Sequence, residues 1–288
     1  MKNILKIYVV LFCFIFVNSS LSAKTIPKII NGKPASTTNY PWLANLFIAN
    51  GADLENGGSC GGTLIDSKWV LTAAHCFLNE AGDQVDLSAG VRTRVTFKLD
   101  AAEPTTEDDF IDVQGKQVFI HPSYNPDSVS SSNENDFDIA LLELELAVEL
   151  TPIKLFIGET PSNIPTIAAG WGATLTDGTG LSDSLLQVQQ ITVSENACNE
   201  MYDNAITFNM ICAGGYTNED KSDTCQGDSG GPLFVNVSNG ALQIGITSFG
   251  GGSEVGSACG IPGLPGVYSK ISELFDFIQT RIPNVIVE

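Results

Sequence analysis

The stretch DTCQGDSGGP, from Asp223 to Pro232, places a serine between glycines. Glycine tolerates backbone angles that other residues avoid, so Ser229 can lie on a tight turn. The N–H groups of such a turn can point at one spot, which is the geometry of an oxyanion hole. A single stretch of this kind is also typical of an ordinary surface turn. Ser229 therefore needs chemical partners elsewhere in the chain.

A serine nucleophile needs a base, and the base needs an orienting acid. The chain has two histidines. His75 lies in TAAHC at 72–76, and Asp138 directly precedes the apolar run IALL, where a partly buried carboxylate needs a hydrogen-bonded partner. The other candidate base, His121, is predicted to lie at the end of a strand. We therefore expect His121→Ala to change the activity of Ser229 little.

The N-terminus has the pattern of a secretory signal peptide. Lys2 and Lys6 precede the 11-residue apolar run IYVVLFCFIFV at 7–17, and small or polar residues follow up to Ala23. A span across a bilayer needs about 20 apolar residues, and a buried core helix is the alternative interpretation. We predict a signal peptide at 1–23, a secreted, extracellular protein and no attachment to a membrane.

The cysteine count supports this interpretation. Of the seven cysteines, Cys13 lies inside the predicted signal peptide, so six remain. An even number in an oxidising compartment predicts disulfides, and six cysteines allow 15 pairings. A zinc site at His75 and Cys76 has little support, because the chain has no C-x-x-C pair. We expect no metal site there.

The chain is strongly acidic, with 33 acidic and 14 basic side chains and a net charge of −19. Four basic residues and no acidic ones lie in residues 1–28, so residues 29–288 carry a net charge of −23. Phosphate contacts need Lys and Arg, so nucleic acid is not an expected partner.

Short apolar runs, bounded by Gly, Pro, Asn and Asp, predict an all-β barrel or sandwich. The runs are 42–49, 62–65, 118–120, 139–146, 166–169, 185–193, 233–237 and 242–249. Residues 91–99 alternate between apolar and polar, as a half-buried strand does. The acidic segment 100–136 is predicted to be an exposed loop that contains one strand.

The end of the chain has a different period. One helical face predicts a C-terminal amphipathic helix, with Ser272 as a candidate N-cap. The face consists of Ile271, Leu274, Phe275, Ile278 and Ile282.

Several blocks together resemble the trypsin/chymotrypsin family of serine proteases, in the order of that family. They are IING at 29–32, CGGTLI at 60–65, WVLTAAHC at 69–76, DIALL at 138–142, GWG at 170–172, the Ser229 stretch and PGVY at 265–268. The resemblance implies two six-stranded antiparallel β-barrels and a C-terminal helix. The protease domain is expected at 29–288, with one barrel at about 29–150 and the other at about 151–288.

The resemblance also implies the catalytic roles. His75 is the base, Asp138 orients it, Ser229 attacks, and the N–H groups of Gly227 and Ser229 bind the oxyanion. Asp223 lies at the base of the primary specificity pocket. The residues expected to line the pocket are Ser248, Gly250 and Gly266. A buried carboxylate there favours Arg or Lys in the substrate.

In this family the precursor is cut before an apolar N-terminal residue. The matching bond is Lys28–Ile29, which makes 24–28 an activation propeptide and implies a zymogen. The freed ammonium of Ile29 is expected to pair with Asp228. The disulfides implied by the family are Cys60–Cys76, Cys198–Cys212 and Cys225–Cys259.

The family's calcium-binding loop falls near 90–112, where the acids match its pattern poorly, so calcium stays an open alternative and no other cofactor is expected. These acids are Asp100, Glu103, Glu107, Asp108, Asp109 and Asp112. Asn236 begins the one sequon after the signal region.

Phe249 stands where Trp is common, which resembles invertebrate digestive members, some of which place the pocket acid elsewhere. The alternatives are therefore a chymotrypsin- or collagenase-like endopeptidase and a non-catalytic binding relative. Expected partners are protein or peptide substrates and protein protease inhibitors, and we expect a monomer.

Overall fold

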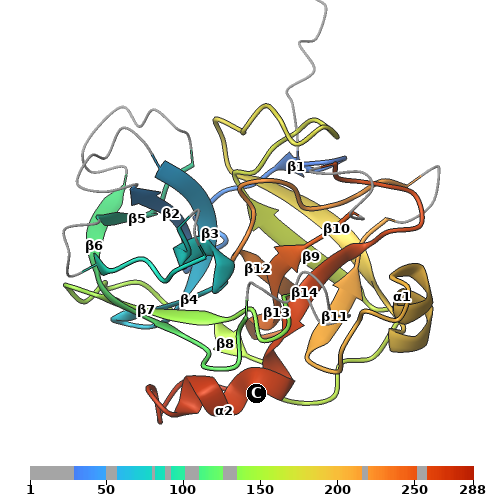
Figure 1. The fold of residues 1–288 in the computed structure, drawn as a ribbon. Coiled ribbons are helices and arrows are strands. Elements are labelled where there is room, and N and C mark those ends of the chain that lie inside the picture. The colour runs from blue at the N-terminus through green and yellow to red at the C-terminus, as the bar shows by residue number, and fades with distance from the viewer. Residues whose placement is uncertain are drawn as a thin grey trace, which may run out of the picture.

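The first half of the described chain forms a closed β-barrel (Figure 1). The computed structural model describes residues 29–49, 57–79, 82–87, 92–100, 110–125, 135–215, 220–251 and 258–288. The barrel has the strand order β2-β3-β4-β7-β6-β5, and all its pairs are antiparallel. Its strands are β2 (Leu43–Ala49), β3 (Gly57–Asp66), β4 (Trp69–Thr72), β5 (Thr93–Phe97), β6 (Ile111–Ile120) and β7 (Ala140–Leu144).

The second half forms another six-stranded antiparallel barrel in the order β10-β11-β14-β13-β12-β9, closed by pairing of β9 with β10. Its strands are β9 (Pro165–Gly170), β10 (Leu186–Val193), β11 (Met210–Ala213), β12 (Pro232–Val237), β13 (Gly240–Phe249) and β14 (Gly266–Lys270). Two short strands add to its outside. β1 (Lys33–Pro34) pairs with β10, and β8 (Lys154–Leu155) runs parallel to β13.

The predicted fold class is confirmed. Each of the eight apolar runs overlaps a strand, and the alternating segment contains β5. In the acidic segment 100–136, the described part contains β6. Residues 1–28, which hold the predicted signal peptide and propeptide, lie outside the described residues. No helix in the described ranges is both long and apolar enough to cross a membrane.

The two barrels share buried contacts. The Thr63 hydroxyl on β3 donates to Gln243 Oε1 on β13 at 2.7 Å, and both side chains are fully buried. The Phe234 ring on β12 packs edge-on against Tyr40 and Trp42, with centroids 5.1 Å away in both cases. Asp138, which precedes β7 of the first barrel, also lies at this junction, since Ser248 of β13 and Ser269 of β14 bond to it.

Helix α2 (Ile271–Gln279) lies below both barrels in Figure 1. Its buried face contains Ile271, Leu274 and Ile278, as the apolar spacing predicted. The predicted N-cap is wrong. The helix begins directly after β14, so Ser272 lies inside it, and its buried hydroxyl has no hydrogen-bond partner in the described structure. The short helices are η1 (His75–Phe77) and α1 (Glu195–Met201).

Candidate active site

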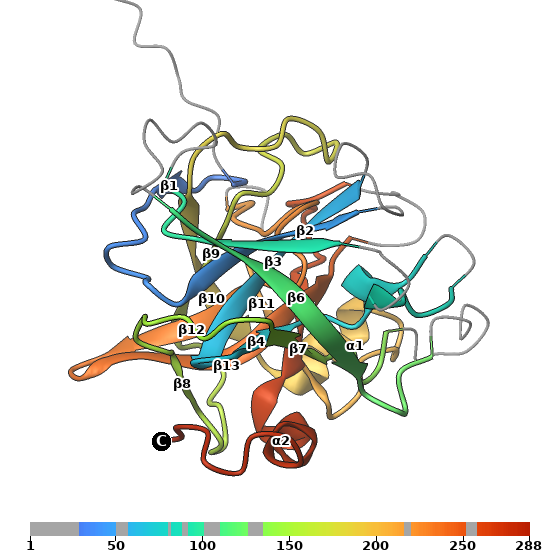
Figure 2. The same ribbon diagram turned by 90° about the vertical axis from the view of Figure 1, so that its left-hand side faces the viewer.

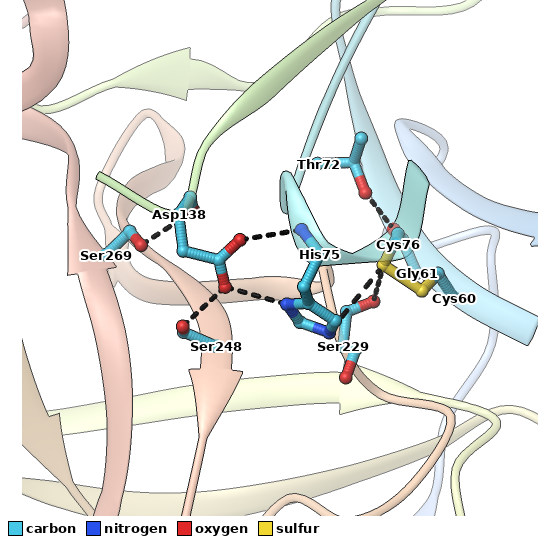
Figure 3. A network of polar contacts seen from close by, with 9 residues as sticks. All are labelled: Cys60, Gly61, Thr72, His75, Cys76, Asp138, Ser229, Ser248 and Ser269. Carbon is cyan, nitrogen blue, oxygen red and sulfur yellow. Dashed lines mark hydrogen bonds and ion pairs between the residues drawn. A yellow bond between two sulfur atoms is a disulfide. The ribbon is translucent and has the colours of Figure 1, made fainter. Parts of the chain in front are cut away.

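His75 and Asp138 come from neighbouring strands. His75 follows β4, Asp138 precedes β7, and pairing of these strands places Thr72 opposite Ala140. Asp138 Oδ1 accepts from the backbone N–H of His75 at 2.9 Å, and Oδ2 lies 2.7 Å from His75 Nδ1 (Figure 3). The carboxylate therefore fixes both the backbone and the ring of His75.

The second barrel also holds Asp138. The Ser248 hydroxyl on β13 donates to Asp138 Oδ2 at 2.5 Å, and the Ser269 hydroxyl on β14 donates to the Asp138 carbonyl at 2.7 Å (Figure 3). Ser248 also lines the pocket to which sequence reasoning assigned it. Its contact with Asp138, and the role of Ser269, were missed because no local motif reveals contacts across 110 and 131 residues.

The electrostatics of the pair follow from these contacts. Burial lowers the pKa of His75, but the charge of Asp138 and its hydrogen bond outweigh burial, so this pKa lies above its ordinary value. Burial raises the pKa of Asp138, but the charge of His75 and hydrogen bonds from His75 and Ser248 place it below its ordinary value. Asp138 therefore remains a carboxylate at neutral pH.

Ser229 lies on a turn tied to both barrels. Its carbonyl accepts from Gly61 N–H of β3 at 2.7 Å, and the next N–H, from Gly230, donates to Thr247 at 2.8 Å. Gly227 and Gly230 have φ of +94° and +77°, which a side chain would strain. In the described structure the Ser229 hydroxyl makes no hydrogen bond to His75 Nε2 (Figure 3). Such catalytic hydrogen bonds commonly tighten only when substrate binds.

The turn leaves two backbone donors free. Asp228 N–H donates to the Cys225 carbonyl, and Gly231 N–H donates to the Asp228 carbonyl, each at 2.9 Å. The N–H groups of Gly227 and Ser229 have no acceptor among the described residues. Two free donors on one tight turn can bind an oxyanion.

A pocket next to Ser229 contains a buried acid. Asp223 is 2% exposed, and its Oδ2 accepts from Gly260 N–H at 2.9 Å, whereas its Oδ1 has no hydrogen-bond partner in the described structure. A Cβ on Gly266 would lie 2.8 Å from Oδ1, and one on Gly250 would lie 3.9 Å from Oδ2. The two glycines thus leave room beside the carboxylate. Burial raises the pKa of Asp223 to about 7.

Asp228 is buried, with 1% of its surface exposed. Its two carboxylate oxygens accept from the N–H groups of Gly172 (2.8 Å) and Cys225 (3.0 Å). Burial raises its pKa to about 6. The Ile29 side chain is fully buried in the core of the second barrel, and the Ile30 carbonyl accepts from Asp223 N–H at 3.3 Å. Lys28 lies outside the described residues.

Comparison with known proteins identifies the family. The family model described as Trypsin matches residues 29–278. Kallikrein-12 of Homo sapiens is 35% identical over 268 residues, which span 92% of this chain and 94% of that protein. A trypsin of Phaedon cochleariae is 35% identical over 274 residues, which span 92% and 93%. This chain belongs to the trypsin family. It is a serine endopeptidase.

A solved structure agrees with the fold of this trypsin-family protease. Neuropsin, described as a serine protease expressed in the limbic system of mouse brain, superposes with a TM-score of 0.70. It is 30% identical, and the match covers 88% of this chain and all of that one.

The described part of this trypsin-family chain contains three disulfides, the same pairs that the resemblance implied: Cys60–Cys76, Cys198–Cys212 and Cys225–Cys259. The sulfur atoms of the first pair lie near His75, but a disulfide has no thiolate to offer a metal.

Two of the acids considered for calcium have protein partners. Asp100 accepts from Ser36 Oγ (3.0 Å) and Thr37 N–H (2.5 Å), and Asp112 accepts from Thr96 Oγ1 (2.5 Å). The four acids Glu103, Glu107, Asp108 and Asp109 lie outside the described residues.

Proposed function

We propose that this trypsin-family endopeptidase is secreted as a zymogen and cleaves peptide bonds after Arg and Lys. The observation that carries the specificity is the buried Asp223 carboxylate. Its Oδ1 lacks a hydrogen-bond partner in the described structure, and Gly266 and Gly250 leave room beside Oδ1 and Oδ2, respectively. A guanidinium or ammonium group would supply the missing partner, because an unpaired buried charge is costly.

In the proposed mechanism, the Ser229 hydroxyl attacks the scissile carbonyl while His75 takes its proton. Asp138 keeps His75 in the required tautomer and stabilises the imidazolium that forms. The free N–H groups of Gly227 and Ser229 bind the oxyanion. The tetrahedral intermediate then collapses: its C–N bond breaks, the amine leaves with the proton from His75, and an acyl–serine ester remains. Water attacks this ester as His75 takes a proton from it, and the acid is released when that proton returns to the Ser229 oxygen.

Activation is proposed to follow cleavage of the Lys28–Ile29 bond, which matches the enzyme's own specificity. The ammonium freed at Ile29 would pair with Asp228, whose burial without a cation keeps its pKa raised. The proximity of Ile30 to Asp223 connects this step to the pocket. We further propose that the mature enzyme is a monomer that acts outside the cell and is open to protein inhibitors.

Profiling of the activated enzyme with anilide substrates tests the specificity. We expect kcat/KM to be higher for Arg and Lys substrates than for Phe and Leu substrates. Asp223→Asn should lower kcat/KM for the Arg and Lys substrates by more than about 10³-fold.

Activation and mechanism are tested separately. N-terminal sequencing of the activated enzyme should find Ile29 as the first residue. Ser229→Ala and His75→Ala should abolish turnover. A preference for Phe would overturn the pocket assignment, and robust turnover by Ser229→Ala would overturn the mechanism.

A further inference from the structure

The residue before Asp138 has an unusual backbone. Phe137 has a φ of +59°, in the left-handed region that bulky residues seldom adopt. Such a conformation is costly and persists only where the surroundings hold it. The neighbouring contacts of Phe137 therefore bear on how Asp138 is placed.

A ring stack holds the side chain of Phe137. The His121 ring lies parallel to it, with centroids 4.7 Å apart and planes inclined by 16°. The His121 ring also lies against Phe277 of α2, with centroids 5.0 Å apart. His121 therefore contacts both the segment that carries Asp138 and the C-terminal helix.

The backbone connects this stack to the acid. Ile139 N–H donates to the Phe137 carbonyl at 2.8 Å, which makes Asp138 the central residue of a three-residue turn. His121 N–H donates to the Ile139 carbonyl at 3.1 Å. Both residues that flank Asp138 are therefore in contact with His121.

The chemistry of His121 suits packing rather than proton transfer. Its Nδ1 accepts from Ser123 N–H at 3.1 Å, which places the proton of the neutral ring on Nε2. Burial lowers the pKa of His121, although the charge of Asp136 opposes this shift. A neutral ring stacks on Phe137 without the cost of desolvating a charge.

We propose that His121 is a positioning residue for Asp138. By stacking on Phe137, His121 holds that residue in its left-handed conformation. This conformation sets the start of the turn that directs the Asp138 carboxylate toward His75. The inference deepens the proposed function and rests on the roles given there to His75 and Asp138. It replaces the expectation from sequence that His121→Ala changes hydrolysis little, which considered His121 only as a base.

The test measures kcat/KM against pH for His121→Ala and for His121→Phe, which keeps a flat ring. His75 must be neutral to act as a base, so activity falls as pH drops below its pKa, and Asp138 raises that pKa. We expect His121→Ala to lower kcat/KM by about 10- to 100-fold. Its acid limb should move to lower pH by about half a unit. His121→Phe should restore both.

Phe137→Asn supplies a second measurement if His121→Ala folds poorly, because Asn tolerates a left-handed φ. His121→Ala should cost little more activity in the Phe137→Asn background. An unshifted acid limb in His121→Ala, failure of His121→Phe to restore activity, or equal losses in both backgrounds would overturn the proposal. Asp138→Asn distinguishes failure of this proposal from failure of the proposed mechanism, because an unchanged pH profile in that variant would contradict the mechanism itself.

Discussion

At the scale of single residues, Asp223 combines burial with an incomplete set of hydrogen bonds. Its pKa of about 7 means that the empty pocket gains its negative charge as pH rises through neutrality. A guanidinium ligand binds the charged form. We therefore expect its affinity to rise about tenfold from pH 6 to pH 8, in proportion to the ionised fraction.

Calorimetric titration of a small guanidinium compound into the inactive Ser229→Ala protein measures this affinity without turnover. In the Asp223→Asn control, the affinity should be weak at every pH and nearly independent of it. A flat profile in protein that retains Asp223 would show that its carboxylate is not the group that meets the cation.

The sequence indicated these site residues through short motifs, since the glycines around Ser229 and the acid before an apolar strand are local features. Contacts between distant segments could not be read in this way. The bond from Ser248 to Asp138 depends on how the two barrels meet, and the φ of Phe137 depends on its stack with His121. Neither has a local signature.

At the scale of elements, the pattern of apolar residues predicted α2 and nine of the twelve barrel strands. It missed β4, β11 and β14, which have only four or five residues each. It could not predict β1 and β8, because a strand of two residues shows no period. The misplaced cap at Ser272 has a related cause, since a strand that runs directly into a helix leaves no turn in which a cap could lie.

The C-terminal tail is an element that the sequence did not suggest. It lies beside β8 (Figure 2), where Leu155 N–H donates to Ile286 and Glu288 N–H donates back to Leu155, at 3.0 and 2.9 Å. Truncation after Asn284 removes these bonds and none of the hydrogen bonds described for His75 and Asp138. We expect a melting temperature about 3–10 °C lower, with kcat/KM within about twofold of wild type.

Scanning calorimetry beside an activity assay decides this prediction. Glu288→Gln is the matched control, since it removes the exposed ion pair with Lys154 and keeps the backbone bonds. That change should move the melting temperature by about 1 °C or less. Loss of activity on truncation, with unchanged stability, would contradict a purely structural tail.

At the scale of the whole molecule, basic residues are scarce and unevenly placed. Residues 117–153, 155–220 and 222–269 contain no Lys or Arg. Lys33 precedes a proline, and Lys116 lies within β6, paired with Glu143 at 2.6 Å. Proteases cut exposed loop tips more readily than strands. An enzyme specific for Arg and Lys should therefore cut itself slowly, with exposed turn residues such as Lys68 and Arg281 as its accessible sites.

Adding one basic residue to an exposed loop tests this expectation. Asp177 lies exposed in a turn, and we expect Asp177→Lys to be cut after that residue while wild type and Asp177→Asn stay intact. Intact mass measured during incubation follows the cleavage. Fragmentation of wild type as fast as Asp177→Lys would show that the distribution of cations gives no protection.

Each end of the described chain packs against the barrel formed by the opposite half of the chain. β1 joins the second barrel. The first barrel is reached by α2 through Phe277 on His121, and by Arg281, just after α2, over Phe119. A force that pulled these ends apart would have to strip β1 from β10 and the tail from β8 before either barrel lost a strand. A pulling force would therefore be resisted first by the second barrel, through the pairing of β1 with β10 and the backbone bonds of the tail to Leu155.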